Sequence, residues 1–133
     1  MPGDKSVVAA VSAGGVIGAL ARYGLSVAWP HGPGDFAWST FVTNVSGCLL
    51  MGVLMVVVTE VYPNHRLIRP FLGIGVLGGY TTFSTYVVDV GHTATAGAAA
   101  TGLAYLFGTV LGALTAVWVG ATATTWAVAR WRR

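Results

Sequence analysis

A side-chain amide and a hydroxyl lie together in a long apolar stretch in the first half of the chain. Asn44 is near the middle of residues 36–61, and Thr40 lies four residues earlier, on the same face if the stretch is helical. The amide offers two N–H donors, which can replace part of the water around an anion. A hydrogen bond that holds two helices together is the other interpretation. The pair therefore predicts an anion-binding position or an interhelical contact.

Glycines and threonines interrupt another apolar stretch, residues 67–90. Residues 78–82 read Gly-Gly-Tyr-Thr-Thr, a run that favours a broken helix. Unwound backbone at membrane depth must be buried in protein or line a cavity, and its free carbonyls can bind a cation such as sodium. The alternative is a kink whose carbonyls are satisfied by the hydroxyls of Thr81, Thr82 or Ser84.

Aromatic rings and further hydroxyls follow this interruption. Phe83 and Tyr86 are three residues apart, so their rings share a helix face. The positive edge of a ring can face an anion, although packing between helices is the usual role of such rings. Thr101, Tyr105 and Thr109 recur every four residues and form a hydroxyl stripe. This stripe predicts an anion track or a weak contact between helices.

No set of residues typical of an enzyme is apparent in the sequence. There is no Ser/His/Asp arrangement, phosphate-binding loop or metal cluster, and the single Cys48 excludes a disulfide framework. We expect His31, His65 and His92 to lie in loops, exposed to solvent. The sequence therefore predicts a protein that is not an enzyme.

The elements that must position these residues are membrane-spanning helices. Only 8% of the 133 residues are charged, against about 25% in soluble domains, and the mean hydropathy is +0.73. One span needs about 20 apolar residues. The sequence predicts a single all-α membrane domain, residues 1–133, with four transmembrane helices at about residues 7–29, 36–61, 67–90 and 96–128, the third broken near its middle.

Basic residues predict how these helices are oriented. Four spans place both termini and the second loop on one side, which carries Lys5, Arg66, Arg69, Arg130, Arg132 and Arg133. The positive-inside rule then places both termini in the cytoplasm. We expect the chain to lie in the plasma membrane. These basic residues are spread over the chain ends and one loop rather than along one face, which argues against nucleic acid binding. Arg22 lies near the outer end of the first span, where it reaches the interface or forms an anion-attracting vestibule.

Glycine pairs four residues apart predict close packing between helices and an oligomer. Such spacing lets helix backbones approach each other in lipid, and four helices are few to enclose a pore. The pairs are Gly14 and Gly18, Gly75 and Gly79, and Gly108 and Gly112.

Two other functions are open at this point. A small four-helix multidrug exporter would need a carboxylate within the first span, but Asp4 precedes that span. Glu60 and Asp89 fall near the ends of their predicted spans, where they are poorly placed to carry protons across the midplane. A structural membrane subunit without transport activity is disfavoured by the broken third span and its threonines.

Three motifs, in order, resemble those of the Fluc (CrcB-type) fluoride channels. Residues 14–23, GGVIGALARY, are similar to GGxxGAxxRY in that family; residues 40–47, TFVTNVSG, resemble TxxxNxxG; and residues 75–86, GVLGGYTTFSTY, resemble GxxGGxTTFSTF. Length and number of spans agree as well. The resemblance implies a passive channel that exports cytoplasmic fluoride, with two small subunits packed antiparallel and pores at their interface.

The resemblance also implies roles for single residues. Asn44 would donate hydrogen bonds to fluoride, and Phe83 would present a ring edge in the pore. The backbone carbonyls of Gly78 and Thr81 would hold a structural sodium ion, and Arg22 matches the arginine of the first motif. The rest of the pore lining would comprise Thr40, Ser84, Tyr86, Tyr105 and Thr109.

Two departures and a charge bias concern the partner subunit. Tyr86 replaces the second phenylalanine of the family motif, and Ala113 stands where the polar track often has a hydroxyl. Because nearly all basic residues share one side, we expect the chain to insert mostly one way. The second subunit of an antiparallel dimer would then be an oppositely oriented homologue. An identical subunit is the alternative if insertion is leaky.

Overall fold

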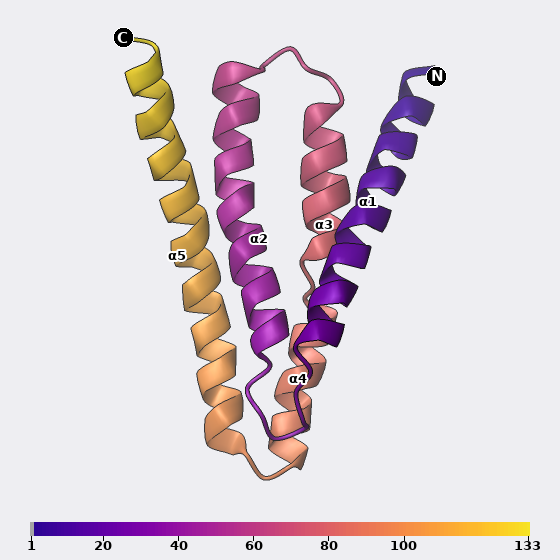
Figure 1. The fold of residues 1–133 in the computed structure, drawn as a ribbon, viewed down its shortest axis with the longest axis vertical. Helices are drawn as coiled ribbons and strands as arrows, with labels where there is room; N and C mark the ends of the chain where they lie inside the picture. The colour runs from indigo at the N-terminus through magenta and orange to yellow at the C-terminus, as the bar shows by residue number, and fades with distance from the viewer. Residues whose placement is uncertain (1) are drawn as a thin grey trace.

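The computed structural model describes residues 2–133 and consists of long helices joined by short connections (Figure 1). The elements are α1 (Pro2–Ala28), α2 (Trp38–Val56) with its π-helical continuation η1 (Val57–Val61), the π-helical η2 (Arg69–Leu77) with the short α3 (Gly78–Tyr80), α4 (Ser84–Thr95) and α5 (Ala99–Trp131). Four stretches are long and apolar enough to cross a membrane: Asp4–Ala28, Trp38–Val61, Arg69–Thr95 and Ala99–Trp131. The described residues form no strands, and the predicted all-α architecture with four spans is confirmed.

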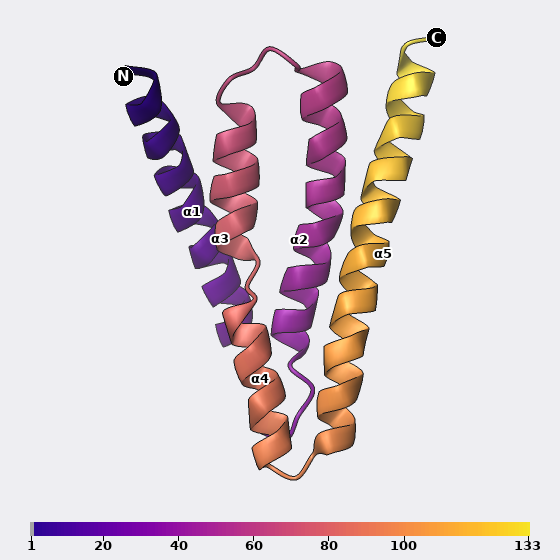
Figure 2. The same cartoon turned by 180° about the vertical axis from the view of Figure 1, so that it is seen from behind.

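The two ends of the helix arrangement differ. Both chain termini lie at one end, together with the connection between η1 and η2 (Figures 1 and 2). The loop between α1 and α2 lies at the other end, beside α4 and the beginning of α5. Helix α1 packs on η2 and α3, while α2 packs on α5. Residues near the α1–α2 loop are therefore brought close to α4 and α5.

The third span is longer than predicted. The sequence placed its end at residue 90 and a link at residues 91–95, but α4 continues to Thr95. The chain turns instead at Gly97, whose φ of 76° is in the left-handed region where glycine is favoured. Asp89 therefore lies in the middle of α4, and still in the last third of the span Arg69–Thr95, as expected for a carboxylate away from the midplane.

The break in the third span lies in the middle of the span, at the C-terminal end of the predicted run. Gly78, Gly79 and Tyr80 remain helical, and the helix ends at Thr81, whose backbone is extended with φ −76° and ψ 156°. The unwound residues are 81–83. The glycines serve close packing instead, because a methyl group at Gly79 would lie 3.0 Å from the Cα atom of Gly15 on α1. A third helix broken near its middle was predicted correctly, and the unwound residues 81–83 overlap the predicted 78–82.

Glycines bring two helix pairs into backbone contact. A methyl group at Gly75 would lie 2.9 Å from Gly14 Cα, and one at Gly14 would lie 2.9 Å from the Val76 nitrogen. Gly52 on α2 packs on α5 equally closely, because a methyl group at Gly52 would lie 2.9 Å from the Ala121 nitrogen. In the third predicted pair only Gly112 is closely packed: a methyl group there would lie 3.1 Å from Val45 Cγ2 on α2, whereas one at Gly108 would meet nothing within 4 Å.

Buried aromatic residues form a small core at the end that holds the α1–α2 loop. Tyr105 on α5 is fully buried, and Tyr86 on α4 is 6% exposed. Phe36 from the loop meets the Tyr105 ring edge-on, with ring centroids 5.1 Å apart. Aromatic pairs of this geometry stabilise a fold beyond the area that they bury. This core holds the loop, α4 and α5 together below the helix break.

Candidate functional site

The Asn44 side chain bridges α2 to the helix break. Its Nδ2 donates a hydrogen bond to the Thr82 carbonyl oxygen at 2.9 Å, and its Oδ1 accepts one from the Thr82 N–H at 2.8 Å. The amide thus satisfies both main-chain groups of one unwound residue. Because an amide nitrogen carries two hydrogens, one N–H of Asn44 is left without an acceptor among the described residues. The interhelical contact foreseen for Asn44 is present, and one donor remains for another partner.

Two backbone carbonyls lose their helical donors at the break. In an unbroken α-helix the N–H of residue i donates to the carbonyl of residue i−4. Here the Thr82 N–H donates to Asn44 instead of to Gly78, and the Thr85 N–H donates to Thr82 Oγ1 at 3.2 Å instead of to Thr81. The carbonyl oxygens of Gly78 and Thr81 are thereby released. These are the two carbonyls at which the family resemblance implies a sodium ion.

The nearby hydroxyls do not satisfy these carbonyls. Thr81 Oγ1 donates to the Leu77 carbonyl at 2.9 Å, one turn earlier. Thr82 Oγ1 lies 3.4 Å from Ser84 Oγ, and both side chains are at the start of α4. The alternative of a kink whose freed carbonyls are satisfied by threonine and serine hydroxyls is therefore wrong for Gly78 and Thr81.

A polar cavity of about 210 Å³ opens between α1, α2 and the break. Arg22 on α1 lines it and is half-buried. Thr40 lines it as well and is 6% exposed. The other lining residues are Ala19, Tyr23, Ser26, Ser39, Thr43, Thr82 and Thr85. The cavity therefore offers one cation and several neutral hydroxyls.

A row of aromatic rings leads from the break toward the α1–α2 loop. The Phe83 and Tyr86 ring centroids are 6.0 Å apart, and those of Tyr86 and Tyr105 are 5.3 Å apart. Phe83 is 77% exposed, whereas the other two rings are buried. The Tyr86 hydroxyl donates to the Leu106 carbonyl at 2.7 Å, which explains how α4 accepts a tyrosine at this position.

The hydroxyl stripe on α5 contains one side chain without a partner. Thr109 is 5% exposed, and its Oγ1 is the one buried side-chain oxygen or nitrogen that lacks a hydrogen bond among the described residues. Tyr105, one turn earlier, donates its hydroxyl to Asp89 Oδ2 at 3.2 Å. An unpaired buried hydroxyl is costly, so such a group commonly has a ligand, water or partner.

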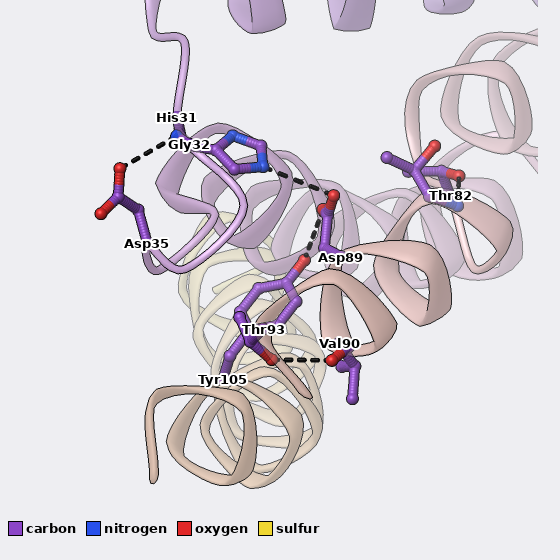
Figure 3. Close-up of polar contacts among 9 residues, drawn as sticks. His31, Gly32, Asp35, Thr82, Asp89, Val90, Thr93 and Tyr105 are labelled. Carbon is purple, nitrogen blue, oxygen red and sulfur yellow. Dashed lines mark hydrogen bonds and ion pairs between the residues drawn. The ribbon is translucent and has the colours of Figure 1, made fainter. Parts of the chain in front are cut away.

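Sequence reasoning missed the environment of Asp89 and His31. Asp89 is 7% exposed, and His31 Nε2 lies 3.4 Å from its Oδ1 (Figure 3). His31 lies in the α1–α2 loop and is exposed, as expected, but its side chain, 26% exposed, also reaches Asp89. The spacing of Asp89, three residues after Tyr86, was the available signal that both face the interior.

Comparison with known proteins gives a consistent result. The family described as "CrcB-like protein, Camphor Resistance (CrcB)" matches residues 9–121. The protein named "Fluoride-specific ion channel FluC 2" from Nocardia farcinica is 51% identical, over 99% of this chain and 94% of its own. "Fluoride-specific ion channel FluC 1" from Streptomyces coelicolor is 56% identical, over 96% of this chain and 82% of its own. Since the family match covers residues 9–121 of this chain of 133, the chain belongs to the CrcB-like family.

Proposed function

We propose that the chain is a passive, fluoride-selective ion channel of the cell membrane that exports cytoplasmic fluoride. The observation that carries this proposal is the 51% identity, over 99% of the chain, to a protein named as a fluoride-specific ion channel. The polar groups around the helix break support the same function. A channel carries out no chemical reaction, which agrees with the prediction that the chain is not an enzyme.

Neutral donors bind the ion in this proposal. Fluoride is small and strongly hydrated, so its water must be replaced by several donors. The remaining N–H of Asn44 and the unpaired hydroxyl of Thr109 are available, and the hydroxyls of Thr40 and Ser84 extend the set. Neutral donors also release the ion, whereas a buried lysine or arginine would hold it. Selective binding and fast passage are therefore compatible.

The aromatic rings contribute their edges rather than hydroxyls. The Tyr86 and Tyr105 hydroxyls donate to other groups of the chain, so their protons are not free for an anion. With Phe83, they present positive ring edges along the path from the break. Arg22, in the polar cavity above, attracts anions to the vestibule without standing in the narrow part of the path.

The freed carbonyls of Gly78 and Thr81 fit a sodium ion. Backbone carbonyls are hard oxygen ligands, and unwound membrane helices use them for Na⁺. These two have lost their helical donors, and the nearby hydroxyls donate elsewhere. When bound, sodium would supply positive charge that stabilises the unwound segment. The site is structural, and no ion movement passes through it.

The channel works as an antiparallel dimer in the membrane. Phe83 is 77% exposed in the single chain, and Ser84 beside it is also exposed. A second subunit would cover these groups and enclose the path. The one-sided basic residues favour a partner that is an oppositely oriented homologue over an identical chain, with both termini of this chain in the cytoplasm. Conduction by the chain expressed alone would indicate an identical partner.

A liposome efflux assay tests the function. Purified chain is reconstituted into vesicles loaded with potassium fluoride, valinomycin is added, and external fluoride is recorded with an electrode. We expect rapid fluoride release without an imposed proton gradient. Release that requires a proton gradient would indicate a coupled exporter, and no release from the chain, alone or with a homologous subunit, would contradict the channel.

A further inference from the structure

A buried carboxylate at the end opposite the termini has partners from two other elements. Asp89 on α4 is 7% exposed. The Tyr105 hydroxyl of α5 donates to its Oδ2 at 3.2 Å, and His31 Nε2 from the α1–α2 loop lies 3.4 Å from its Oδ1. Figure 3 shows the two side chains approaching the carboxylate from different directions. A loop side chain thus reaches a carboxylate that the helices bury.

This carboxylate lies at the end of the proposed fluoride path. The ring row that begins at Phe83 passes through Tyr86 to Tyr105, whose hydroxyl touches Asp89. An anion that moves along these rings therefore meets a negative charge in a dry environment. Charges in such surroundings interact strongly because little water screens them.

Few other charged groups can offset this carboxylate. Arg22 on α1 lines the separate polar cavity at the break, and α2 has no charged side chain. The loop carboxylate of Asp35 is negative itself and accepts a hydrogen bond from a backbone N–H of the same loop at 2.9 Å. His92, on α4, is exposed. The Tyr105 hydroxyl is neutral. His31 is thus the one group in contact with Asp89 that can become a cation, among the described residues.

We propose that His31 is the counter-ion of Asp89, and that its protonated form neutralises the carboxylate so that an anion can pass this end of the path. The proposal rests on the fluoride channel proposed above. A histidine changes its charge between about pH 5 and pH 8. Protonated His31 and Asp89 carry no net charge together. Neutral His31 leaves one negative charge beside the rings, and that charge repels fluoride.

The test compares fluoride efflux at external pH 5.5 and 8.0. The variants are His31→Gln, which keeps a polar side chain without a charge, Asp89→Asn, which can still accept from Tyr105, and the double variant. His65→Gln, in the loop at the other end, is the matched control. Elution as a single species from a sizing column shows that each variant is folded, and protein-free vesicles give the leak.

We expect wild-type and His65→Gln efflux to fall about fivefold or more from pH 5.5 to 8.0, in line with loss of one histidine charge. His31→Gln should be slow at both values. Asp89→Asn and the double variant should be fast at both, because no charge then needs a counter-ion. The counter-ion proposal would be overturned if efflux by the double variant were as slow as efflux by His31→Gln. It would also be overturned if efflux by His31→Gln changed with pH as it does in the wild type. Absence of fluoride efflux in every protein would overturn the channel itself and the counter-ion with it.

Discussion

Substitution of Asn44 by aspartate tests the link between the helix break and ion passage. One carboxylate oxygen would still accept from the Thr82 N–H. The other would replace Nδ2, which in the wild type donates to the Thr82 carbonyl oxygen at 2.9 Å, so an oxygen would face an oxygen. Leaving a buried carbonyl unpaired costs about 1–3 kcal/mol, and a buried unpaired charge adds to this. We expect a loss of about 3 kcal/mol in the free energy of unfolding, or about a hundredfold in the folded-to-unfolded ratio.

Fluoride efflux should be lost in Asn44→Asp, because a negative charge replaces the donor that faces the anion. Stability is measured by equilibrium unfolding of the solubilised protein in dodecyl sulfate, followed by tryptophan fluorescence. Ser46→Ala is the matched control on the same helix. It removes the 2.9 Å hydrogen bond to the Tyr80 hydroxyl and the contacts with the Val42 and Thr43 carbonyls of the same helix, and should cost about 1 kcal/mol with efflux retained. If Asn44→Asp equals Ser46→Ala in both stability and efflux, the reasoning about Asn44 is refuted.

Four further predictions follow from the packing, the released carbonyls, the unpaired hydroxyl and the charge bias. Gly75→Ala should destabilise the fold by about 1–3 kcal/mol, because its methyl group would meet α1 backbone at 2.9 Å, whereas Gly24→Ala, with nothing within 4 Å, should be neutral or stabilising in the same unfolding assay. Replacing sodium by N-methyl-D-glucamine during purification should lower efflux and dimer content on a sizing column; equal behaviour in both buffers would count against the sodium site. Thr109→Val should keep or raise stability, because a partnerless hydroxyl is removed, and should slow efflux; unchanged efflux would remove Thr109 from the path. A tag at the C-terminus of the chain expressed alone should be labelled only from the cytoplasmic side; equal labelling on both sides would favour an identical partner.

The number of spans and the existence of a break could be predicted because both follow from local composition. Long apolar stretches predict helices, and the Gly-Gly-Tyr-Thr-Thr run predicts a weak point in one of them. Which residues of this run unwind could not be predicted, because that depends on α2. Asn44 binds the main-chain groups of Thr82, so the helix unwinds there, while Gly78 and Gly79 stay helical.

The candidate pore residues were identified by type, but their partners were not. Tyr86 was expected in the pore lining, but the partner of its hydroxyl, the Leu106 carbonyl of α5, was not foreseen. His31 is exposed as expected, but its contact with Asp89 on α4 was not foreseen. Contacts between residues tens of positions apart leave no periodic signal in a single sequence, so they appear only in the folded chain.

The central claim, a passive path for fluoride, is tested most directly by the reversal potential of the current in a planar bilayer. With a fluoride gradient, symmetrical chloride and equal pH on both sides, the account predicts a current that reverses at the equilibrium potential of fluoride and stays there when chloride or pH is changed on one side, although its size varies with pH. A reversal potential that follows chloride or the proton gradient would contradict it.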